Sequence, residues 1–253
     1  MKNFKLYDLS HPFGDKCPLW PYFDDVKIER KHYHAKSGVL SQVITTTMHC
    51  TTHADSPAHV FEGGMFTDEI PLESYYGTGV TVSIPKNKWE KIMPEDLENV
   101  RPKIEKGDIV MINTGWHHKY GDSVEYFCYS PGLYREAGEW FVEKGVKCVG
   151  VDQQALDHPM ATAIGPHGTG PIRPDICEEY EKERNRKVIE DFPEWEPCHN
   201  LLLRNGIMGY ENVGGDLDQV TGMRCTFAGF PIRWTKGDGS IVRIVAIVDK
   251  GDQ

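Results

Sequence analysis

The chain has little of what marks a membrane, secreted or nucleic-acid-binding protein. None of its apolar runs approaches the length of about 20 residues that spans a bilayer. Its 28 Lys and Arg are outnumbered by 38 Asp and Glu, which argues against a surface for nucleic acid or anionic lipid. Residues 1–5 lead directly to Asp8 without the long apolar stretch of a secretory signal. These absences predict a cytoplasmic protein with no membrane or nucleic-acid partner.

Disulfide and linker signals are also absent. The seven cysteines are an odd number and include no Cys-x-x-Cys pair, which indicates free thiols in a reducing compartment. Cys50 and Cys198 each adjoin a histidine, and as neighbours along a strand or helix their thiols should point away from it. No Ser-rich or Gly-rich linker and no internal repeat interrupts the chain. We therefore expect one domain over residues 1–253.

The hydrophobic pattern predicts a mixed α/β fold with a β-rich core. A helix should follow the Ser-Pro-Gly turn at residues 130–132 and end at Gly145. The charged stretch 178–191 is typical of a solvated helix with ion pairs four residues apart. Expected strands, rich in β-branched residues or apolar throughout, cover residues 4–9, 26–33, 39–48, 79–84, 108–114, 147–152, 207–211, 224–230 and 241–248.

Residues 49–59 concentrate the side chains that bind divalent metals. His49, His53, Asp55 and His59 stand at offsets 0, 4, 6 and 10. Three protein ligands with one open position make a catalytic metal site, and the first three residues supply them. His59 would then be a spare imidazole for proton transfer. In a straight strand His49 and His53 would be roughly 13 Å apart, so the chain must bend after His49.

A second pair of candidate ligands lies far downstream. His199 precedes an apolar helical stretch that the Asn-Gly pair at residues 205–206 should end. Glu211 closes the expected strand at 207–211. A buried histidine with a carboxylate partner is common in protein cores, so the spacing alone leaves a structural role and a ligand role open.

The pattern His-x-x-Thr-His-x-Asp-x-Pro-x-His at residues 49–59 resembles the signature of the metal-dependent cyclase and kynurenine formamidase family, which includes isatin hydrolases. Thr51 stands where that pattern usually has Gly. The similarity extends over most of the chain, including the segments 8–12, 18–21, 112–116, 150–152, 230–232, 238–240 and 242–243.

The resemblance implies a swivelling β/β/α architecture and a set of ligands. In formamidase members, residues matching His49, His53 and Asp55 hold one metal, and residues matching Asp55, His199 and Glu211 hold a second. The residue matching His59 acts as acid or base. Isatin hydrolases work with one metal, so one or two ions per chain are expected, and mixed His and carboxylate ligation suits Zn²⁺ and Mn²⁺ alike.

The expected activity is hydrolysis of an amide, formamide or lactam of a small aromatic or cyclic substrate by metal-activated water. Lactone hydrolysis, or cyclisation or dehydration at the same site, is the alternative enzyme activity, and a noncatalytic metal-binding protein is a third interpretation. The resemblance suggests that Trp20 binds an aromatic substrate, although core or interface packing would also explain it. His11, His158 and His167 could also line the site, although a single histidine is more often a structural or surface group, while His117 and His118 fit either the surface or a pocket rim. A homo-oligomer, either dimer or tetramer, is expected.

Overall fold

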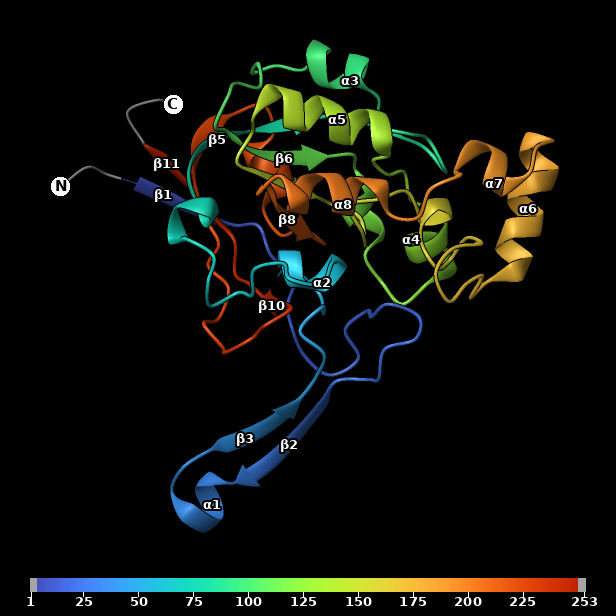
Figure 1. Cartoon of the computed structure of the whole chain (residues 1–253). Helices are drawn as coiled ribbons and strands as arrows, with labels where there is room; N and C mark the ends of the chain where they lie inside the picture. Colours follow the sequence, from blue (N-terminus) through green and yellow to red (C-terminus); the bar gives the residue numbers. More distant parts are fainter. Residues whose placement is uncertain (1–3, 250–253) are drawn as a thin grey trace.

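The computed structural model describes residues 4–249 and is built on one large mixed sheet (Figure 1). The sheet has nine strands in the order β1-β11-β9-β5-β6-β7-β8-β4-β10, and β5 to β8 run parallel in its centre. This arrangement confirms the mixed α/β class with a β-rich core. The strands are β1 (Phe4–Asp8), β4 (His53–Asp55), β5 (Tyr76–Ser83), β6 (Ile109–Asn113), β7 (Cys148–Val151), β8 (Met208–Glu211), β9 (Arg224–Ala228), β10 (Gly239–Ile241) and β11 (Val245–Asp249).

Short helices surround the sheet, and α5 and α8 run side by side against its parallel part (Figure 1). Within residues 4–249, no helix is both long and apolar enough to cross a membrane. The α-helices are α1 (His34–Ser37), α2 (Pro57–Val60), α3 (Pro94–Asn99), α4 (Val124–Cys128), α5 (Arg135–Lys144), α6 (Pro174–Arg184), α7 (Val188–Asp191), α8 (Pro197–Arg204) and α9 (Leu217–Val220). The 3₁₀ turns of the described part of the chain are η1 (Leu72–Tyr75), η2 (Trp116–Lys119) and η3 (Pro159–Ala161).

The central strands are buried on both faces, which explains their continuous apolar sequences. In β6, Ile109 and Met111 pack into one core cluster, whereas Val110 and Ile112 face the other. Successive side chains of a strand point to opposite faces, so a strand covered on both sides needs apolar residues throughout. The second cluster includes Phe141 of α5, and this packing holds the helical layer against the sheet.

The sheet is strongly curled, as the link between β10 and β11 requires. These strands are the ninth and second in the sheet order, which would place them about 34 Å apart if the sheet were flat. Only residues 242–244 join them, and that link reaches at most about 14 Å. The single strand expected over 241–248 is therefore wrong, because within those residues the chain leaves the edge strand β10 and enters β11, next to the opposite edge of the sheet.

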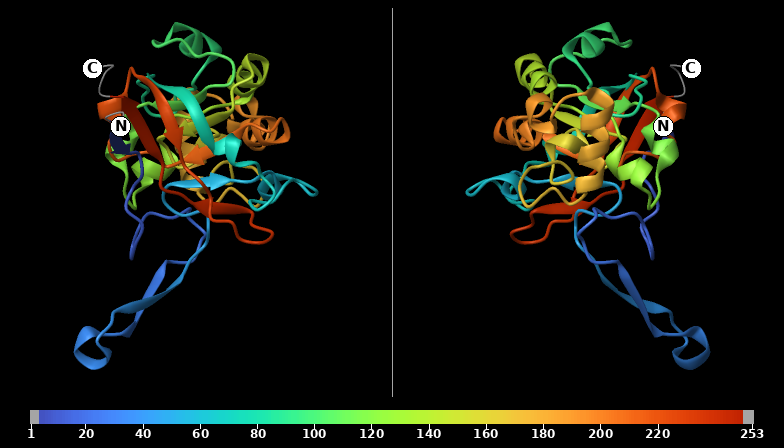
Figure 2. Two further views of the ribbon diagram at one scale, coloured as in Figure 1. Left: turned by 90° about the vertical axis from the view of Figure 1, so that its left-hand side faces the viewer. Right: turned by 90° about the vertical axis from the view of Figure 1, so that its right-hand side faces the viewer.

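Residues 27–45 form a hairpin that projects away from the body of the molecule (Figures 1 and 2). Its strands are β2 (Lys27–His32) and β3 (Ser41–Thr45), and α1 lies at its tip. The sequence predicted a longer strand over 39–48 that leads directly into the metal-binding segment, but β3 ends at Thr45. Val43 and Ile44 are 47% and 50% exposed, so the β-branched residues of this strand do not enter the core.

Helix ends follow the expected signals. Gly145 ends α5 with a φ of 71°, and Asn205 caps α8 as predicted. The charged stretch 178–191 is divided between α6 and α7, because Asn185 takes a left-handed backbone with a φ of 53°. Asparagine adopts this conformation more readily than most residues, so the break is local to that position.

His158 gives the fold a specific sensitivity to acid. It is fully buried, its Nδ1 accepts the Met160 N–H at 3.1 Å, and its ring stacks on Phe192. Burial lowers its pKa to about 3, whereas an unfolded histidine titrates near 6.5. Between these values the unfolded chain binds more protons, so this residue's contribution to stability is present above about pH 6.5 and is lost as the pH falls.

We therefore expect His158→Asn to lose less stability than the wild type when the pH falls from 7.5 to 5. The difference between the two losses should be up to about 2 kcal/mol. Urea unfolding of both proteins at the two pH values measures it, and the other histidines cancel because both proteins carry them. Equal losses would show that His158 does not remain neutral in the folded protein.

Candidate metal centre

Strand pairing brings the first candidate ligands together. His53 and Asp55 lie two residues apart on β4, so they share one face of the sheet. The antiparallel register of β4 with β8 places Glu211 directly opposite His53. His53 Nε2 lies 3.4 Å from Asp55 Oδ1 and 3.3 Å from Glu211 Oε2. A histidine and two carboxylates therefore meet at one end of the paired strands.

His49 joins this group because the chain turns sharply before β4. Thr51 takes a left-handed φ of 50°, and its hydroxyl accepts the Tyr120 O–H at 2.9 Å. The bend predicted after His49 is thus present, at the position where the family pattern usually has Gly. His49 Nδ1 lies 2.8 Å from Asp55 Oδ1, and its Nε2 lies 3.1 Å from Asp238 Oδ2.

Gly239 makes room for the His49 ring. A Cβ atom added at Gly239 would lie 2.6 Å from His49 Cε1, which is closer than such atoms approach in real structures. Asp238 hydrogen-bonds His49, and position 239 must therefore be glycine to leave room for the His49 ring.

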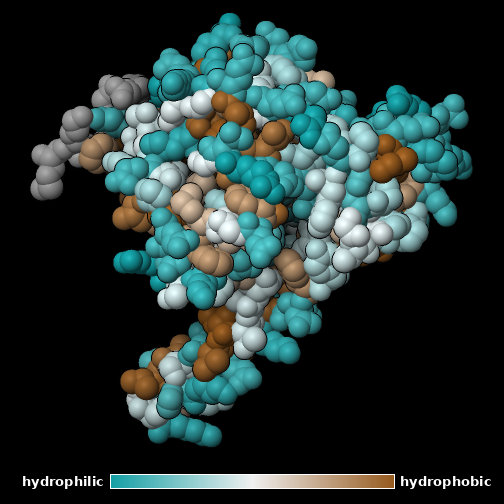
Figure 3. Space-filling model, viewed as in Figure 1, coloured by the Kyte–Doolittle hydropathy of each residue, from teal (hydrophilic) through white to brown (hydrophobic). Residues whose placement is uncertain are grey.

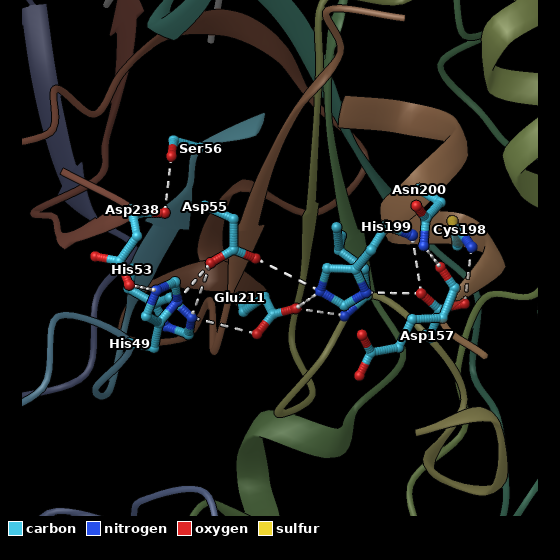
Figure 4. Close-up of polar contacts among 12 residues, drawn as sticks. His49, His53, Asp55, Ser56, Asp157, Cys198, His199, Asn200, Glu211 and Asp238 are labelled. Carbon is cyan, nitrogen blue, oxygen red and sulfur yellow. Dashed lines mark hydrogen bonds and ion pairs between the residues drawn. The ribbon is translucent and has the colours of Figure 1, made fainter. Parts of the chain in front are cut away.

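His199 approaches from the opposite side, at the start of α8 (Figure 4). Its Nε2 lies 2.9 Å from Glu211 Oε1 and 3.5 Å from Asp55 Oδ2. Figure 4 shows His49 and His53 on one side of the two carboxylates and His199 on the other. These five residues form the central cluster, which consists of His49, His53, Asp55, His199 and Glu211.

In His53 and His199, a hydrogen bond from Nδ1 leaves Nε2 of the ring free to bind a metal. His53 Nδ1 donates to the Thr51 carbonyl at 2.8 Å, and His199 Nδ1 donates to Asp157 Oδ2 at 2.7 Å. Asp157 also accepts the His199 N–H at 2.9 Å, which fixes the carboxylate on α8. Such partners set the tautomer of metal-binding histidines, so the donor set fits a divalent cation.

The electrostatics of the central cluster also fit a cation. Burial alone would lower the pKa of His53, but hydrogen bonds to Asp55 and Glu211 raise it to about 10. The same contacts with imidazoles hold the pKa of the fully buried Asp55 well below its usual value, against the effect of burial. Two buried carboxylates require positive charge nearby, which protons on the imidazoles or a metal ion can supply.

His59 and several aromatic residues complete a pocket over the central cluster. His59 lies on α2 just after β4, and its ring stacks on His49 with centroids 4.0 Å apart. His59 is exposed to the pocket space, and the partial desolvation of its ring by the surrounding protein lowers its pKa to about 4. The aromatic side chains of the pocket wall are Trp20, Tyr22, Phe23 and Phe127. An imidazole and an aromatic surface therefore face the same space as the candidate ligands.

The structure brings together every site residue expected from the sequence, including Trp20. The other histidines lie elsewhere. His11 stacks on Tyr120, His158 packs in the core, and His117 contacts Asp152 and Asp218. The thiol of Cys198 points into the core packed on α5, as expected, and the thiol of Cys50 lies 3.2 Å from that of Cys17.

The sequence did not predict the pocket aromatics Tyr22, Phe23 and Phe127, nor three polar residues of the site. Asp157 orients His199, Asp238 contacts His49, and Glu196 lines the pocket immediately before α8. Burial raises the pKa of Glu196 to about 7, and its backbone is left-handed with a φ of 45°. Only Asp238 had a signal in the sequence, since it opens one of the segments that resemble the family.

Comparisons with curated proteins find relatives that span almost all of the chain. A kynurenine formamidase from Bacillus cereus (strain ATCC 10987 / NRS 248) is 24% identical over 246 residues, which cover 97% of this chain and 98% of the relative. The kynurenine formamidase of Bacillus cytotoxicus is 22% identical over 249 residues, with the same coverage.

Solved structures share the fold. An isatin hydrolase bound to the product analogue thioisatinate superposes with a TM-score of 0.77 at 19% identity, covering 98% of this chain and 93% of the other. Isatin hydrolase A from Labrenzia aggregata, bound to benzyl benzoate, gives 0.74 at 22% identity, covering 98% and 94%. The sequence model of the Cyclase family, described as "Putative cyclase", matches residues 7–158, more than half of the chain. The chain belongs to the Cyclase family.

Proposed function

We propose that this protein is a metal-dependent hydrolase that cleaves an amide, formamide or lactam C–N bond in a small aromatic or cyclic substrate. The observation that carries this proposal is the central cluster itself, in which buried carboxylates and imidazoles converge in the wall of an aromatic-lined pocket. The relatives named kynurenine formamidase and isatin hydrolase support the same class of bond.

The central cluster suggests two positions for divalent ions. His49, His53 and Asp55 would hold the first, and Asp55, His199 and Glu211 would hold the second. The two oxygens of Asp55 support this division, because Oδ1 faces His49 and His53 while Oδ2 faces His199. Imidazole and carboxylate ligands suit Zn²⁺ and Mn²⁺, and either ion would supply water activation and carbonyl polarisation when bound.

Side chains of the pocket transfer protons and bind the substrate. The His59 imidazole accepts the proton of the attacking water and returns it to the leaving nitrogen, as a general base and then a general acid. Trp20, Phe23 and Phe127 pack against the substrate ring and exclude bulk water from the scissile bond. Asp157 and Asp238 take no proton in this scheme; they hold His199 and His49 in place.

Turnover of an N-formylkynurenine-type formamide and of isatin tests the proposed hydrolysis. In ¹⁸O-labelled water a hydrolase incorporates the label into the carboxylate product, whereas a cyclase or dehydratase that uses the same site does not. Lactones form the matched ester series, and a preference for them over the amides would reassign the substrate class.

The projecting hairpin supports the expected homo-oligomer. Exposed apolar side chains gather along it, including Val39, Leu40, Val43 and Ile44 (Figure 3). The hairpin follows closely after Tyr22 and Phe23, which line the pocket. We propose that a second copy of this chain covers these apolar residues and lies close to the pocket mouth, in a dimer or tetramer.

His59→Ala should retain its metal and lose about 10² to 10⁴ in kcat, because the ligands remain while the proton-transfer group is removed. Asp55→Ala should lose both metal and activity, since both proposed positions use that carboxylate. Elemental analysis and steady-state kinetics on the purified variants measure the two effects. Full activity in either variant would contradict the role given to that residue.

Asp157→Asn should weaken metal binding about 10-fold to 100-fold, because the Asn side chain no longer accepts the His199 Nδ1–H as a carboxylate does. Competition with a chelator measures the affinity. Asp191→Asn is the matched control, since Asp191 accepts the Tyr180 hydroxyl at 2.8 Å and does not line the pocket. Equal affinity in both variants would remove His199 from the ligand set.

The double variant Val43→Glu with Ile44→Glu should dissociate the oligomer, because it places two carboxylates on the apolar strand of the hairpin. Light scattering after gel filtration should give a multiple of 28.7 kDa for the wild type and one chain mass for the variant. Leu72→Glu, at a residue 64% exposed on the body, is the control. A monomeric wild type at micromolar concentration would overturn the assembly.

A further inference from the structure

A second group of metal-binding side chains lies between η2 and α9, away from the central cluster. His117 and His118 are neighbours on η2, and Asp218 belongs to α9. None of these three residues lines the pocket over the central cluster. The hydrolytic proposal makes no use of them.

The spacing of their ligand atoms suits a small cation. His118 Nε2 lies 3.1 Å from Asp218 Oδ2, and His117 Nε2 lies 3.4 Å from Asp218 Oδ1. One ligand atom from each of the three residues can be chosen so that all lie within 4.8 Å of one another. Ligand atoms of a tetrahedral zinc site lie about 3.3 Å apart, because each Zn–N or Zn–O bond is about 2.0 to 2.2 Å long. A zinc ion would therefore need only small side-chain movements.

A buried carboxylate orients His117 toward Asp218. Asp152 is fully buried and accepts from His117 Nδ1 at 3.1 Å. The backbone N–H groups of Thr114 and Trp116 also bind the Asp152 carboxylate, at 3.1 and 2.9 Å, so its position is fixed from several sides. With Nδ1 used in this way, His117 presents Nε2 as the free ligand atom, the arrangement found behind many zinc-binding histidines.

Asp218 is held in place as well. Asn113 Nδ2 donates to Asp218 Oδ1 at 2.9 Å, which leaves Oδ2 toward His118. The side chains of His118 and Asp218 are 61% and 54% exposed. An ion can therefore enter from solvent, and water can fill the coordination position that the protein leaves open.

We propose that His117, His118 and Asp218 form a further metal site, separate from the central cluster, that binds Zn²⁺ and links η2 to α9. Two imidazoles and one carboxylate match the donor preference of this ion. Because the ligands come together only in the folded chain, the bound ion stabilises the native state by mass action. The site is independent of the hydrolytic activity and of the number of ions in the central cluster.

Zinc titration by calorimetry on the full-length chain, with any affinity tag removed, tests the site. The wild type should bind one more Zn²⁺ per chain than Asp218→Asn or His118→Ala. Both residues are exposed, so these variants should fold, and circular dichroism checks this. The control is Asp122→Asn, which removes an exposed carboxylate outside the site and should leave the stoichiometry unchanged.

Thermal unfolding gives a second readout. Saturating Zn²⁺ should raise the Tm of the wild type more than that of Asp218→Asn. Equal stoichiometry in the wild type and both variants would overturn the proposal and leave the three residues as hydrogen-bonded ion pairs only. The difference between proteins is the measured quantity, so the result stands whether or not the central cluster binds metal.

Discussion

The burial of Asp55 and Glu211 is the constraint on which the rest of the site depends. Both carboxylates lie inside the protein, where a negative charge is costly unless cations or hydrogen-bond donors surround it. The protons of three imidazoles can meet that need, and divalent ions would meet it more fully by replacing those protons. The same requirement explains why Asp238, the Thr51 carbonyl and Asp157 hydrogen-bond His49, His53 and His199. These partners orient each imidazole so that it presents a defined nitrogen to the carboxylates.

The curled sheet allows distant segments to satisfy this constraint. β4 pairs with β8 on one side and β10 on the other, so one short strand aligns His53 with Glu211 and places the 238–239 segment beside His49. α8 then delivers His199 from the helical layer. The immediate passage from β10 to β11 closes the curl, and the N-terminal segment adds Trp20 to the pocket wall. Fold and site are thus products of the same strand order.

The sequence predicted those parts of the site that local spacing encodes. His49, His53, Asp55 and His59 stand close together in the chain, so their chemistry was visible without a fold. His199 and Glu211 were assigned through the family resemblance, because no local pattern shows that β8 pairs with β4. Asp157 and Glu196 could not be found, since their roles arise only when the segment before η3 packs against the start of α8.

The fold shows the same division. Apolar and β-branched runs located β5, β6 and β7, whose composition reflects burial on both faces. The same criterion predicted one strand over 241–248 where the structure has β10 and β11, because hydrophobicity does not report where in a sheet a strand lies. It also gave no sign that the β-branched residues of β3 would be exposed on a projecting hairpin, where a partner rather than the core would cover them.

Metal content per chain shows whether the central cluster holds divalent ions. Elemental analysis of Asp218→Asn, purified without added metal or chelator, counts the ions at the central cluster without the His117, His118 and Asp218 site. We expect about two ions of Zn²⁺ or Mn²⁺ per chain. One ion would be consistent with a hydrolase in which Asp55 does not serve two metal positions. No metal, with none restored by dialysis against either ion, would rule out a metal-dependent hydrolase.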